Sequence, residues 1–206
     1  MEQHFNQITL IGNPVGRPTY SHSNHGRNFF VFPLEVKRLS GVVDRLQILA
    51  TEELLEETMV DESCSLCVTG QIRSYNSHKP GGRRLIISVL AETMELTDLP
   101  HDNRVSLLGN LCKPPIYRRT PLGREICDIM LAVNRSYRKA DYLPCILWGN
   151  AARQGETYTV GTPLLLTGRL QSREYIKVID DLSEHRTAYE ISAITSQVPE
   201  EEEDPA

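Results

Sequence analysis

The sequence is poor in aromatic residues and has no long apolar segment. Phenylalanine, tryptophan and tyrosine together make up 6% of its 206 residues, and Trp148 is the single tryptophan. A membrane-spanning helix needs about 18 or more consecutive apolar residues, and the sequence shows neither such a run nor a signal-peptide pattern. We therefore expect a cytoplasmic protein that makes no membrane contact.

Motifs for catalysis and metal binding are also missing. The sequence has neither a glycine-rich phosphate loop nor a nucleophile motif, so we expect no enzyme activity and no cofactor. Its five cysteines are an odd number, which favours reduced thiols over a disulfide framework. Cys64 and Cys67 have CxxC spacing, but no second Cys or His pair follows at zinc-finger distance, so no metal site is predicted. The other cysteines are interpreted as small core residues: Cys112, Cys127 and Cys145.

Charge is unevenly distributed along the chain. Residues 1–101 contain 9 Lys/Arg and 12 Asp/Glu, a net charge of −3, whereas residues 102–197 contain 13 and 10, a net charge of +3. Residues 198–206 add five acids and no Lys or Arg. The overall charge of −5 therefore hides a cationic second half, which suits a polyanionic partner.

The chain contains an internal repeat. Residues 6–13 return as residues 103–110, an offset of 97 positions, and the same offset pairs Pro18 with Pro115. After one inserted residue, Thr69 and its neighbours correspond to Thr167 and its neighbours. Two copies of a unit of about 97 residues predict two small tandem domains, with a boundary near His101, and an acidic tail. The predicted segments are residues 1–100, 101–197 and 198–206.

Each copy is predicted to form five strands and one short helix. In the first copy the strands lie near residues 6–12, 28–38, 45–50, 65–74 and 85–96, with a helix near 52–60 that Thr51 caps. In the second they lie near 103–111, 125–136, 143–149, 163–174 and 187–196, with a helix near 150–156. Gly70 and Gly168 lie inside strand patterns, which is typical of the bend that a small barrel needs. This order of elements predicts an all-β protein of two tandem OB-folds, five-stranded Greek-key barrels.

Residues 129–175 interleave large aromatic side chains with cations. The rings stand where predicted strands end or turn: Tyr137, Tyr142, Trp148 and Tyr175. Rings that stack on bases and cations that contact phosphates are what a single-strand nucleic-acid groove requires. This stretch alone leaves an alternative open, in which the rings belong to the core and the arginines to an ordinary surface.

The same region resembles the bacterial single-stranded DNA-binding protein family. The resemblance lies in the order Ile129-x-Leu-Ala-x(4)-Tyr137, Tyr142, Trp148-Gly and Leu-x-Gly168-x-Leu-x-x-Arg-x-Tyr175, with Asn103-Arg-Val-x-Leu-x-Gly-Asn110 upstream. It covers residues 103–196 and implies an OB-fold whose four stacking positions are those four rings. It also implies binding of single-stranded DNA without sequence specificity, in replication, recombination or repair on the bacterial nucleoid. Phosphate contacts are expected from a subset of Arg104, Arg118, Arg135, Arg138, Lys139, Arg153, Arg169, Arg173 and Lys177.

The first copy lacks this aromatic set. Its residues aligned with Tyr137, Trp148 and Tyr175 are Ser40, Ala50 and Ser77, and Asp44 or a neighbour takes the place of Tyr142. Phe30 and Phe32 alternate with Val31 and are expected to share a buried face, with Phe29 pointing the other way. We expect the first copy to be mainly structural. A weak nucleic-acid surface formed by Tyr75, Arg73, Lys79, Arg83 and Arg84 is the alternative.

Assembly and partners are inferred from the resemblance. Because the family usually presents four OB-folds per assembly, a chain with two is expected to form a homodimer. A primosome- or plasmid-type accessory protein that assembles replication proteins on DNA is the alternative, and a protein-binding OB scaffold is a third class. The acidic tail is expected to be disordered. Two interpretations of it stay open: recruitment of replication or repair proteins, and a solubilising end that repels polyanions.

Overall fold

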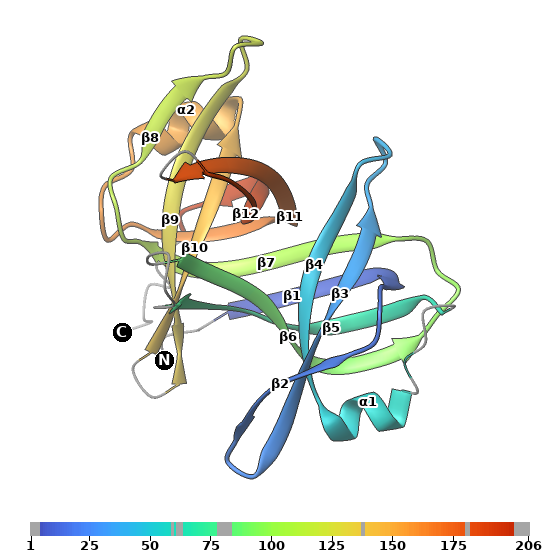
Figure 1. The fold of residues 1–206 in the computed structure, drawn as a ribbon. Helices are drawn as coiled ribbons and strands as arrows, with labels where there is room; N and C mark the ends of the chain where they lie inside the picture. Colours follow the sequence, from blue (N-terminus) through green and yellow to red (C-terminus); the bar gives the residue numbers. More distant parts are fainter. Residues whose placement is uncertain are drawn as a thin grey trace, which may run out of the picture.

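The computed structural model describes residues 5–58, 60, 64–77, 84–136, 139–179 and 182–199, without the side chains of residues 177–179 and 182. The described residues form twelve strands and two short helices (Figure 1). The first copy contains β1 (Phe5–Pro14), β2 (Thr19–Asn24), β3 (Arg27–Lys37), β4 (Val43–Thr51), α1 (Glu52–Thr58), β5 (Leu66–Ser77) and β6 (Arg84–Leu96). The second contains β7 (Asp102–Leu111), β8 (Ile116–Arg119), β9 (Glu125–Arg135), β10 (Lys139–Trp148), α2 (Asn150–Glu156), β11 (Pro163–Ile179) and β12 (Leu182–Gln197).

Each copy closes its strands into a barrel with the same topology. In the first, hydrogen bonds connect β3, β4, β6, β5 and β1 in that order, and a short β1–β3 pairing closes the ring. The second repeats this order with β9, β10, β12, β11 and β7, closed by β7–β9. Both contain one parallel pairing, β4–β6 and β10–β12. The prediction of two tandem OB-folds is confirmed.

Apolar residues that alternate along the strands fill both barrels. In the first copy Leu46, Ile48 and Ala50 of β4 are fully buried, while the residues between them reach the surface. Gly70 and Gly168 each lie at a register shift in a strand pair, and a Cβ there would collide with the backbone oxygens of Leu90 and Ser192. The prediction that these glycines mark bends of the barrel is therefore confirmed.

The two barrels share one continuous sheet. Strand β1 pairs antiparallel with β7, and Ile8 lies opposite Val105, its own counterpart in the repeat. An antiparallel pairing centred on equivalent residues relates the copies by an approximate two-fold axis at this point. The chain therefore contains within itself an arrangement that resembles a symmetric dimer, with the two barrels on either side of the β1–β7 pair (Figure 1).

A second set of contacts joins the copies and follows the same axis. Asp141 is fully buried, forms an ion pair with Arg135 of its own copy, and accepts a hydrogen bond from the backbone N–H of Ser74 in the other copy. Its counterpart Asp44 is equally buried. It pairs with Arg38 at 2.6 Å and accepts the backbone N–H of Ser172 at 2.7 Å. Each carboxylate thus neutralises a cation of its own barrel and anchors a strand of the other, so we call these two sets of contacts the aspartate anchors.

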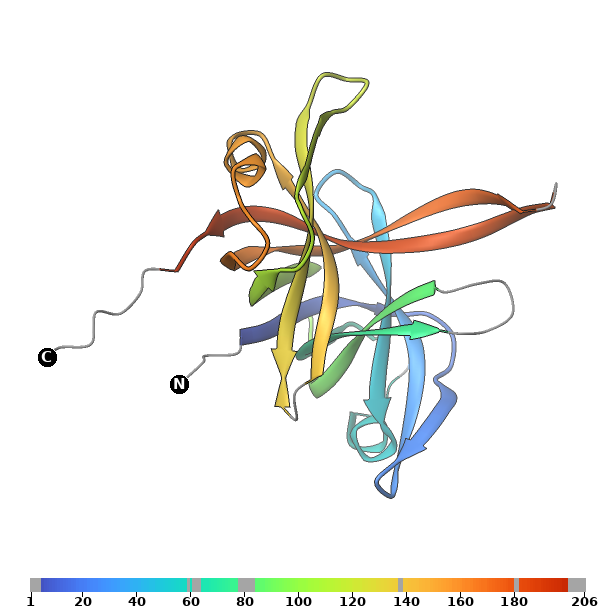
Figure 2. The ribbon, with the colours of Figure 1, turned by 90° about the vertical axis from the view of Figure 1, so that its left-hand side faces the viewer.

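The anchored strands belong to long two-stranded ribbons. β5–β6 and β11–β12 extend beyond their barrels and project to the same side of the molecule (Figure 2). Ser172 lies on the β11–β12 ribbon and Ser74 on β5–β6. Each ribbon therefore crosses onto the neighbouring barrel.

The predicted strands are present, but two further ones were not predicted. Strands β2 and β8 pair with β3 and β9 as outer hairpins. All six residues of β2 are exposed, so the strand lacks the apolar alternation that sequence analysis depends on. Helix α1 follows Thr51 as predicted, with the Leu54 backbone N–H donating to the Thr51 hydroxyl at 3.3 Å, and it ends at Thr58 rather than near residue 60.

The strand register corrects the alignment of the two copies. Trp148 lies opposite Ile126, and the matching pair in the first copy is Phe29 with Thr51. Trp148 therefore corresponds to Thr51 rather than to the buried Ala50. The inserted residue is Gly149, which separates β10 from α2 with a positive φ of 56°. By the same register Tyr142 corresponds to Arg45.

Candidate nucleic-acid interface

Two predicted stacking residues lie on the outer face of β10. Leu143, Cys145 and Leu147 alternate along this strand and fill the core. Tyr142 and Trp148 occupy the opposite parity, and 48% and 36% of their surfaces are exposed. Six residues of extended chain separate them by roughly 20 Å, so the two rings are placed to contact different parts of an extended ligand.

The indole of Trp148 is fixed by the neighbouring strand. Its Nε1–H donates to the hydroxyl of Ser192 on β12 at 3.0 Å. Ser192 itself is buried, with 5% of its surface exposed. A hydrogen bond at the polar edge of the ring holds the indole in one orientation while part of its surface stays open to solvent.

The third described ring, Tyr175, lies on the β11–β12 ribbon. It is 36% exposed, and the guanidinium carbon of Arg173 lies 5.7 Å from its ring centroid, a cation–π contact. Paired residues of neighbouring strands point to the same side of a sheet. Ser192 of β12 pairs with Ile146 of β10, which points to the same side as Tyr142 and Trp148. Along β12 and β11 the pairs Ser192–Arg169 and Arg186–Tyr175 lie on this side too, so the three rings share one side of the β10–β12–β11 sheet. We call this side the aromatic face.

Several of the predicted cations form ion pairs with nearby carboxylates. The described pairs are Arg104 with Asp102 at 2.5 Å, Arg118 with Asp128 at 2.6 Å, and Arg153 with Glu125 at 2.7 Å. The three arginine side chains are 73%, 51% and 63% exposed, so each remains accessible to a phosphate. Exposed ion pairs of this kind are weak in water and exchange readily for another anion.

Arg135 has a different environment. It pairs with the buried Asp141 and also donates to the backbone oxygen of Ser74 at 3.0 Å. Its guanidinium therefore belongs to an aspartate anchor, and Arg73 of the first copy contacts the same carboxylate at 3.2 Å. The contacts of Arg135 and Asp141 with Ser74 thus link the two copies next to Tyr142. The backbone N–H of Tyr142 also donates to the Ser74 hydroxyl, at 2.7 Å.

The remaining predicted site residues are placed as follows. Lys139 is exposed at the start of β10, and Arg169 is half-buried on β11 with its Nε lacking a hydrogen-bond partner among the described residues. Tyr137 and Arg138 lie outside the described residues, as does the side chain of Lys177. In the first copy Tyr75 is exposed, whereas Lys79 and Arg83 also lie outside.

Sequence analysis missed the residues that position these rings. Ser192 holds Trp148, and the aspartate anchors hold the β10 strand, yet none of them was predicted. A signal was present for the anchors: Arg38 and Asp44 recur as Arg135 and Asp141 at the offset of the repeat. An acid and a base repeated in both copies at the same spacing indicate a structural pair.

Two of the five cysteines, Cys127 and Cys145, are buried in the second copy. Burial raises the pKa of the Cys145 thiol, and it also raises the pKa of Cys127, so both thiols stay protonated at neutral pH.

The described residues contain no group of three or more His, Cys, Asp and Glu side chains that could hold a metal ion. Among the helices that the structure describes, none is long and apolar enough to cross a membrane.

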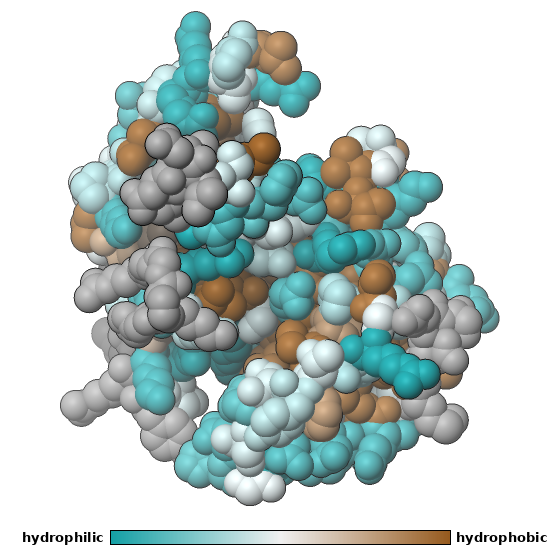
Figure 3. Space-filling model, in the orientation of Figure 1, coloured by the Kyte–Doolittle hydropathy of each residue, from teal (hydrophilic) through white to brown (hydrophobic). Residues whose placement is uncertain are grey.

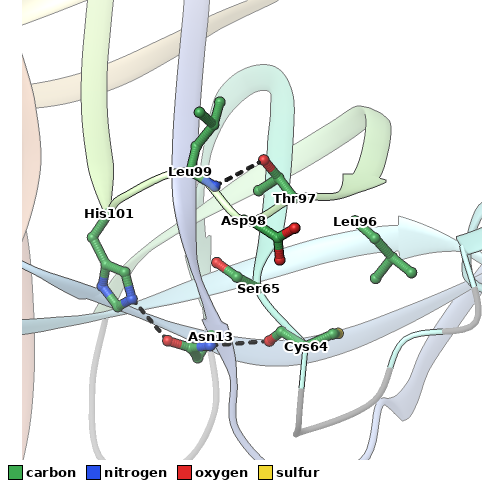
Figure 4. Close-up of a pocket in the computed structure, with 8 residues that line it drawn as sticks. All are labelled: Asn13, Cys64, Ser65, Leu96, Thr97, Asp98, Leu99 and His101. Carbon is green, nitrogen blue, oxygen red and sulfur yellow. Dashed lines mark hydrogen bonds between the residues drawn. The ribbon is translucent and has the colours of Figure 1, made fainter.

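A hollow of about 560 Å³ next to the first barrel is built around the connection between the copies (Figure 4). Here His101 Nε2 contacts Asn13 Oδ1 at 2.8 Å, and the Asn13 amide donates to the backbone oxygen of Cys64 at 3.0 Å. The other ring nitrogen of His101 accepts the backbone N–H of Lys37 at 2.8 Å. Both nitrogens are thus used to attach the connecting segment, so these contacts are structural.

Comparison with known proteins relates the second copy to one protein family. The single-strand binding protein family has a sequence model that matches residues 102–198. Single-stranded DNA-binding protein 1 of Staphylococcus aureus is 40% identical over 80 residues, covering 35% of this chain and 48% of that protein. Single-stranded DNA-binding protein B of Bacillus subtilis is 38% identical over 80 residues, covering 35% of this chain and 71% of that protein. The chain spans about half the length of most of the curated relatives it matches.

The likeness of fold extends over the whole chain. The crystal structure of the wild-type single-stranded DNA binding protein from Thermus aquaticus matches with a TM-score of 0.80 and 22% identity. The match covers 99% of this chain and 97% of that one. At this level of identity the likeness concerns the fold, a tandem of two OB-folds.

Proposed function

Because this chain belongs to the single-strand binding protein family, we propose that it binds single-stranded DNA without sequence specificity and acts in DNA replication, recombination or repair. The observation that supports this most is the aromatic face. Tyr142, Trp148 and Tyr175 are partly exposed on one side of a single sheet, and each described ring is available to a base. Every base has a flat face, so stacking of this kind does not depend on sequence.

The proposed mechanism combines stacking with neutralisation of phosphates. Bases stack on the three described rings and on Tyr137, while the backbone contacts exposed cations of the second copy, with Arg173 nearest to a stacking ring. Each phosphate contact releases counterions, so affinity decreases as salt increases. Arg135 contributes by holding β10 in place through Asp141. Binding involves no bond making or breaking, which is in keeping with a non-enzymatic role.

Assembly into a homodimer is part of the proposal. Two chains together present four OB-folds, and the first strands of both copies are already paired with each other as β1 and β7. Further contacts between chains therefore use other surfaces. The space-filling view shows hydrophobic side chains exposed in patches among hydrophilic ones on the face from which the ribbons project (Figure 3). Light scattering at micromolar concentration is expected to give twice the chain mass of 23.3 kDa, and a stable monomer would contradict it.

The binding proposal is tested by the fluorescence of Trp148, the single tryptophan. Titration with poly-dT is expected to quench its emission, because a base stacked on the indole offers a route for quenching. Duplex DNA of equal length is the control and is expected to bind much more weakly. Equal affinity for duplex and single strand, or an emission that stays unchanged at saturation, would contradict the proposal.

A further inference from the structure

The first barrel has a hollow where the second has its tryptophan. This hollow, of about 510 Å³, is bounded by Thr51 of β4 and Leu90 of β6. Thr51 corresponds to Trp148, as described above. Leu90 corresponds to Ser192, because Leu90 lies beside Leu49 in the first copy as Ser192 lies beside Ile146 in the second.

The second copy therefore indicates what such a space accommodates. There the indole of Trp148 bridges from β10 to Ser192 with a hydrogen bond of 3.0 Å. In the first copy both partners are changed at once: the ring is replaced by the small Thr51, and the hydroxyl by the apolar Leu90. The result is an open hollow lined by the apolar side chains of Phe29, Leu54 and Leu90, with the buried Ala91 beside them.

The rim of the hollow is acidic. Glu53 and Glu57 of α1 and Glu92 of β6 line it with a single cation, Arg27. All three carboxylates belong to exposed residues. In the second copy Ile194 stands at the place of Glu92, and α2 has no acidic residue in its first turn, so the acidic rim of the first copy is not repeated there.

The charge of the rim decides between ligand classes. Glu53 accepts hydrogen bonds from its own backbone N–H and from Thr51, which lower the pKa of its carboxyl and keep it ionised at neutral pH. Three carboxylates against one guanidinium repel a phosphate backbone and attract Lys or Arg side chains. A base of the bound strand is therefore disfavoured here, even though the space itself is suited to a flat ring.

We propose that this hollow is a docking site for a polypeptide segment in which an aromatic side chain is flanked by lysine or arginine. The aromatic ring enters between Thr51 and Leu90, where it takes the place that Trp148 has in the second barrel. The flanking cations contact Glu53, Glu57 and Glu92. A large aromatic anchor in an apolar pocket with charged groups around it is a common arrangement of strong protein contacts. The site lies on the barrel that lacks the aromatic face, so the chain would hold DNA on one copy and a protein on the other.

The test uses the full chain and a rhodamine-labelled peptide, Lys-Lys-Trp-Lys-Lys, measured by fluorescence anisotropy. Two further peptides serve as ligand controls: Lys-Lys-Ala-Lys-Lys lacks the ring and Glu-Glu-Trp-Glu-Glu lacks the cations. We expect the first peptide to bind at least tenfold more tightly than either control. Equal affinity for the peptides with and without the ring would overturn the proposal.

Two variants give the first copy the residues that the second copy has at the same places. Thr51→Trp fills the hollow with a ring of the chain itself and is expected to weaken peptide binding at least tenfold. Leu90→Ser makes the floor polar and is expected to weaken it by about threefold or more. Because Trp148 and Ser192 occupy these positions in a folded barrel, both variants are expected to keep their circular dichroism, and the loss of the Thr51 cap of α1 in Thr51→Trp is expected to cost only a small part of the stability. Peptide binding that is unchanged in both folded variants would overturn the proposal.

The role of the rim is tested with two charge-matched variants. Neutralising the rim by Glu53→Gln, Glu57→Gln and Glu92→Gln is expected to abolish the preference for the lysine peptide over the glutamate peptide. The control neutralises three exposed acids elsewhere, Glu95→Gln, Glu156→Gln and Glu174→Gln, and is expected to keep that preference. Equal loss of the preference for the lysine peptide in both variants would mean that peptide binding is a nonspecific effect of net charge.

The variant Thr51→Trp also tests whether the hollow is an interface between copies of the chain. If it changes the oligomeric state in light scattering without altering peptide affinity, the hollow is such an interface and the proposal is wrong.

Discussion

The two barrels of this chain share a scaffold and differ on their surfaces. The same strand order, the same glycine bends and the same buried aspartate occur in both. On the outer face of the sheet, however, the second barrel has Tyr142 and Trp148 where the first has Arg45 and Thr51. The comparison shows that the two copies keep the contacts that fold them and join them, while residues on the exposed outer face have diverged.

The electrostatic difference has the same direction as the aromatic one. The first copy has a net charge of −3 over residues 1–101 and an acidic hollow, whereas the second has +3 over residues 102–197. Stacking and phosphate neutralisation are the two main contributions to single-strand binding. Both contributions therefore favour the second copy, which suggests a division of labour that the following variants either break or sharpen.

The largest effect is expected on stability, from the core of the first copy. Phe32 is fully buried on β3, so Phe32→Ala leaves a cavity and is expected to lower the free energy of unfolding by about 3–5 kcal/mol. Urea denaturation monitored by circular dichroism measures it. Single-strand affinity in the absence of urea is expected to stay within about twofold, because the aromatic face is on the other copy. A large loss of affinity in a chain that is still folded would contradict a mainly structural role for this copy.

Much of this architecture could be predicted from the sequence because it depends on local patterns. The repeat gave both copies at once, and alternating apolar residues gave ten of the twelve strands. Phe32 was predicted to be buried and is; its neighbour Phe30 is half-buried and packs edge-on against Tyr20 at 5.8 Å. The edge strands β2 and β8 are short and largely exposed, so they leave little periodicity in the sequence.

What sequence analysis could not predict depends on contacts between the copies. The burial of Asp44 and Asp141 was not predicted, because each becomes buried only through contact with the other barrel. The same is true of Arg135, which the sequence presents as a cation beside aromatic residues. Its partner Asp141 becomes inaccessible only when the β5–β6 ribbon of the first copy crosses β10. The stacking roles of the aromatic residues remain predictions.

The second prediction concerns the aspartate anchors, which the two copies share. Asp44→Asn and Asp141→Asn each remove a buried charge that neutralises an arginine. Each is expected to lower the free energy of unfolding by about 3 kcal/mol. Asp128→Asn, at an exposed ion pair with Arg118, is the matched control, with an expected cost below about 1 kcal/mol. Thermal unfolding of the three variants measures the difference, and similar costs for Asp128 and Asp141 would show that the anchors do not join the copies.

The third prediction concerns how Trp148 is held. Ser192→Ala removes the acceptor of the indole N–H and is expected to weaken single-strand binding by about 1 kcal/mol, roughly fivefold. Thr195→Ala on the same strand removes a hydroxyl that bonds Thr167 instead, and is expected to leave affinity unchanged. Binding is measured by anisotropy of a labelled dT oligomer. Equal affinities of the two variants would mean that the hydrogen bond to Ser192 does not position the ring.

The smallest effect is expected from single exposed cations. Arg173→Gln is expected to weaken binding a few-fold at low salt and to reduce the slope of log affinity against log salt by roughly 0.7, the value for one phosphate contact on a single strand. Arg45→Gln in the first copy, at the position of Tyr142, is the control and is expected to leave the slope unchanged. Affinity measured over a range of salt concentrations gives both slopes. A decrease of the slope in Arg45→Gln would place phosphates on the first copy as well.

The most direct test of the division of labour compares one ring from each copy. Trp148→Ala and Tyr75→Ala each remove an exposed aromatic side chain, 36% and 59% exposed in the folded protein. Titration of both variants with the same labelled dT oligomer, in one buffer, measures what each copy contributes. We predict that Trp148→Ala weakens binding by about 1–3 kcal/mol and that Tyr75→Ala changes it by less than about twofold, with unchanged circular dichroism in both. An equal loss in the two variants would show that both barrels contact the strand and would contradict the division of labour.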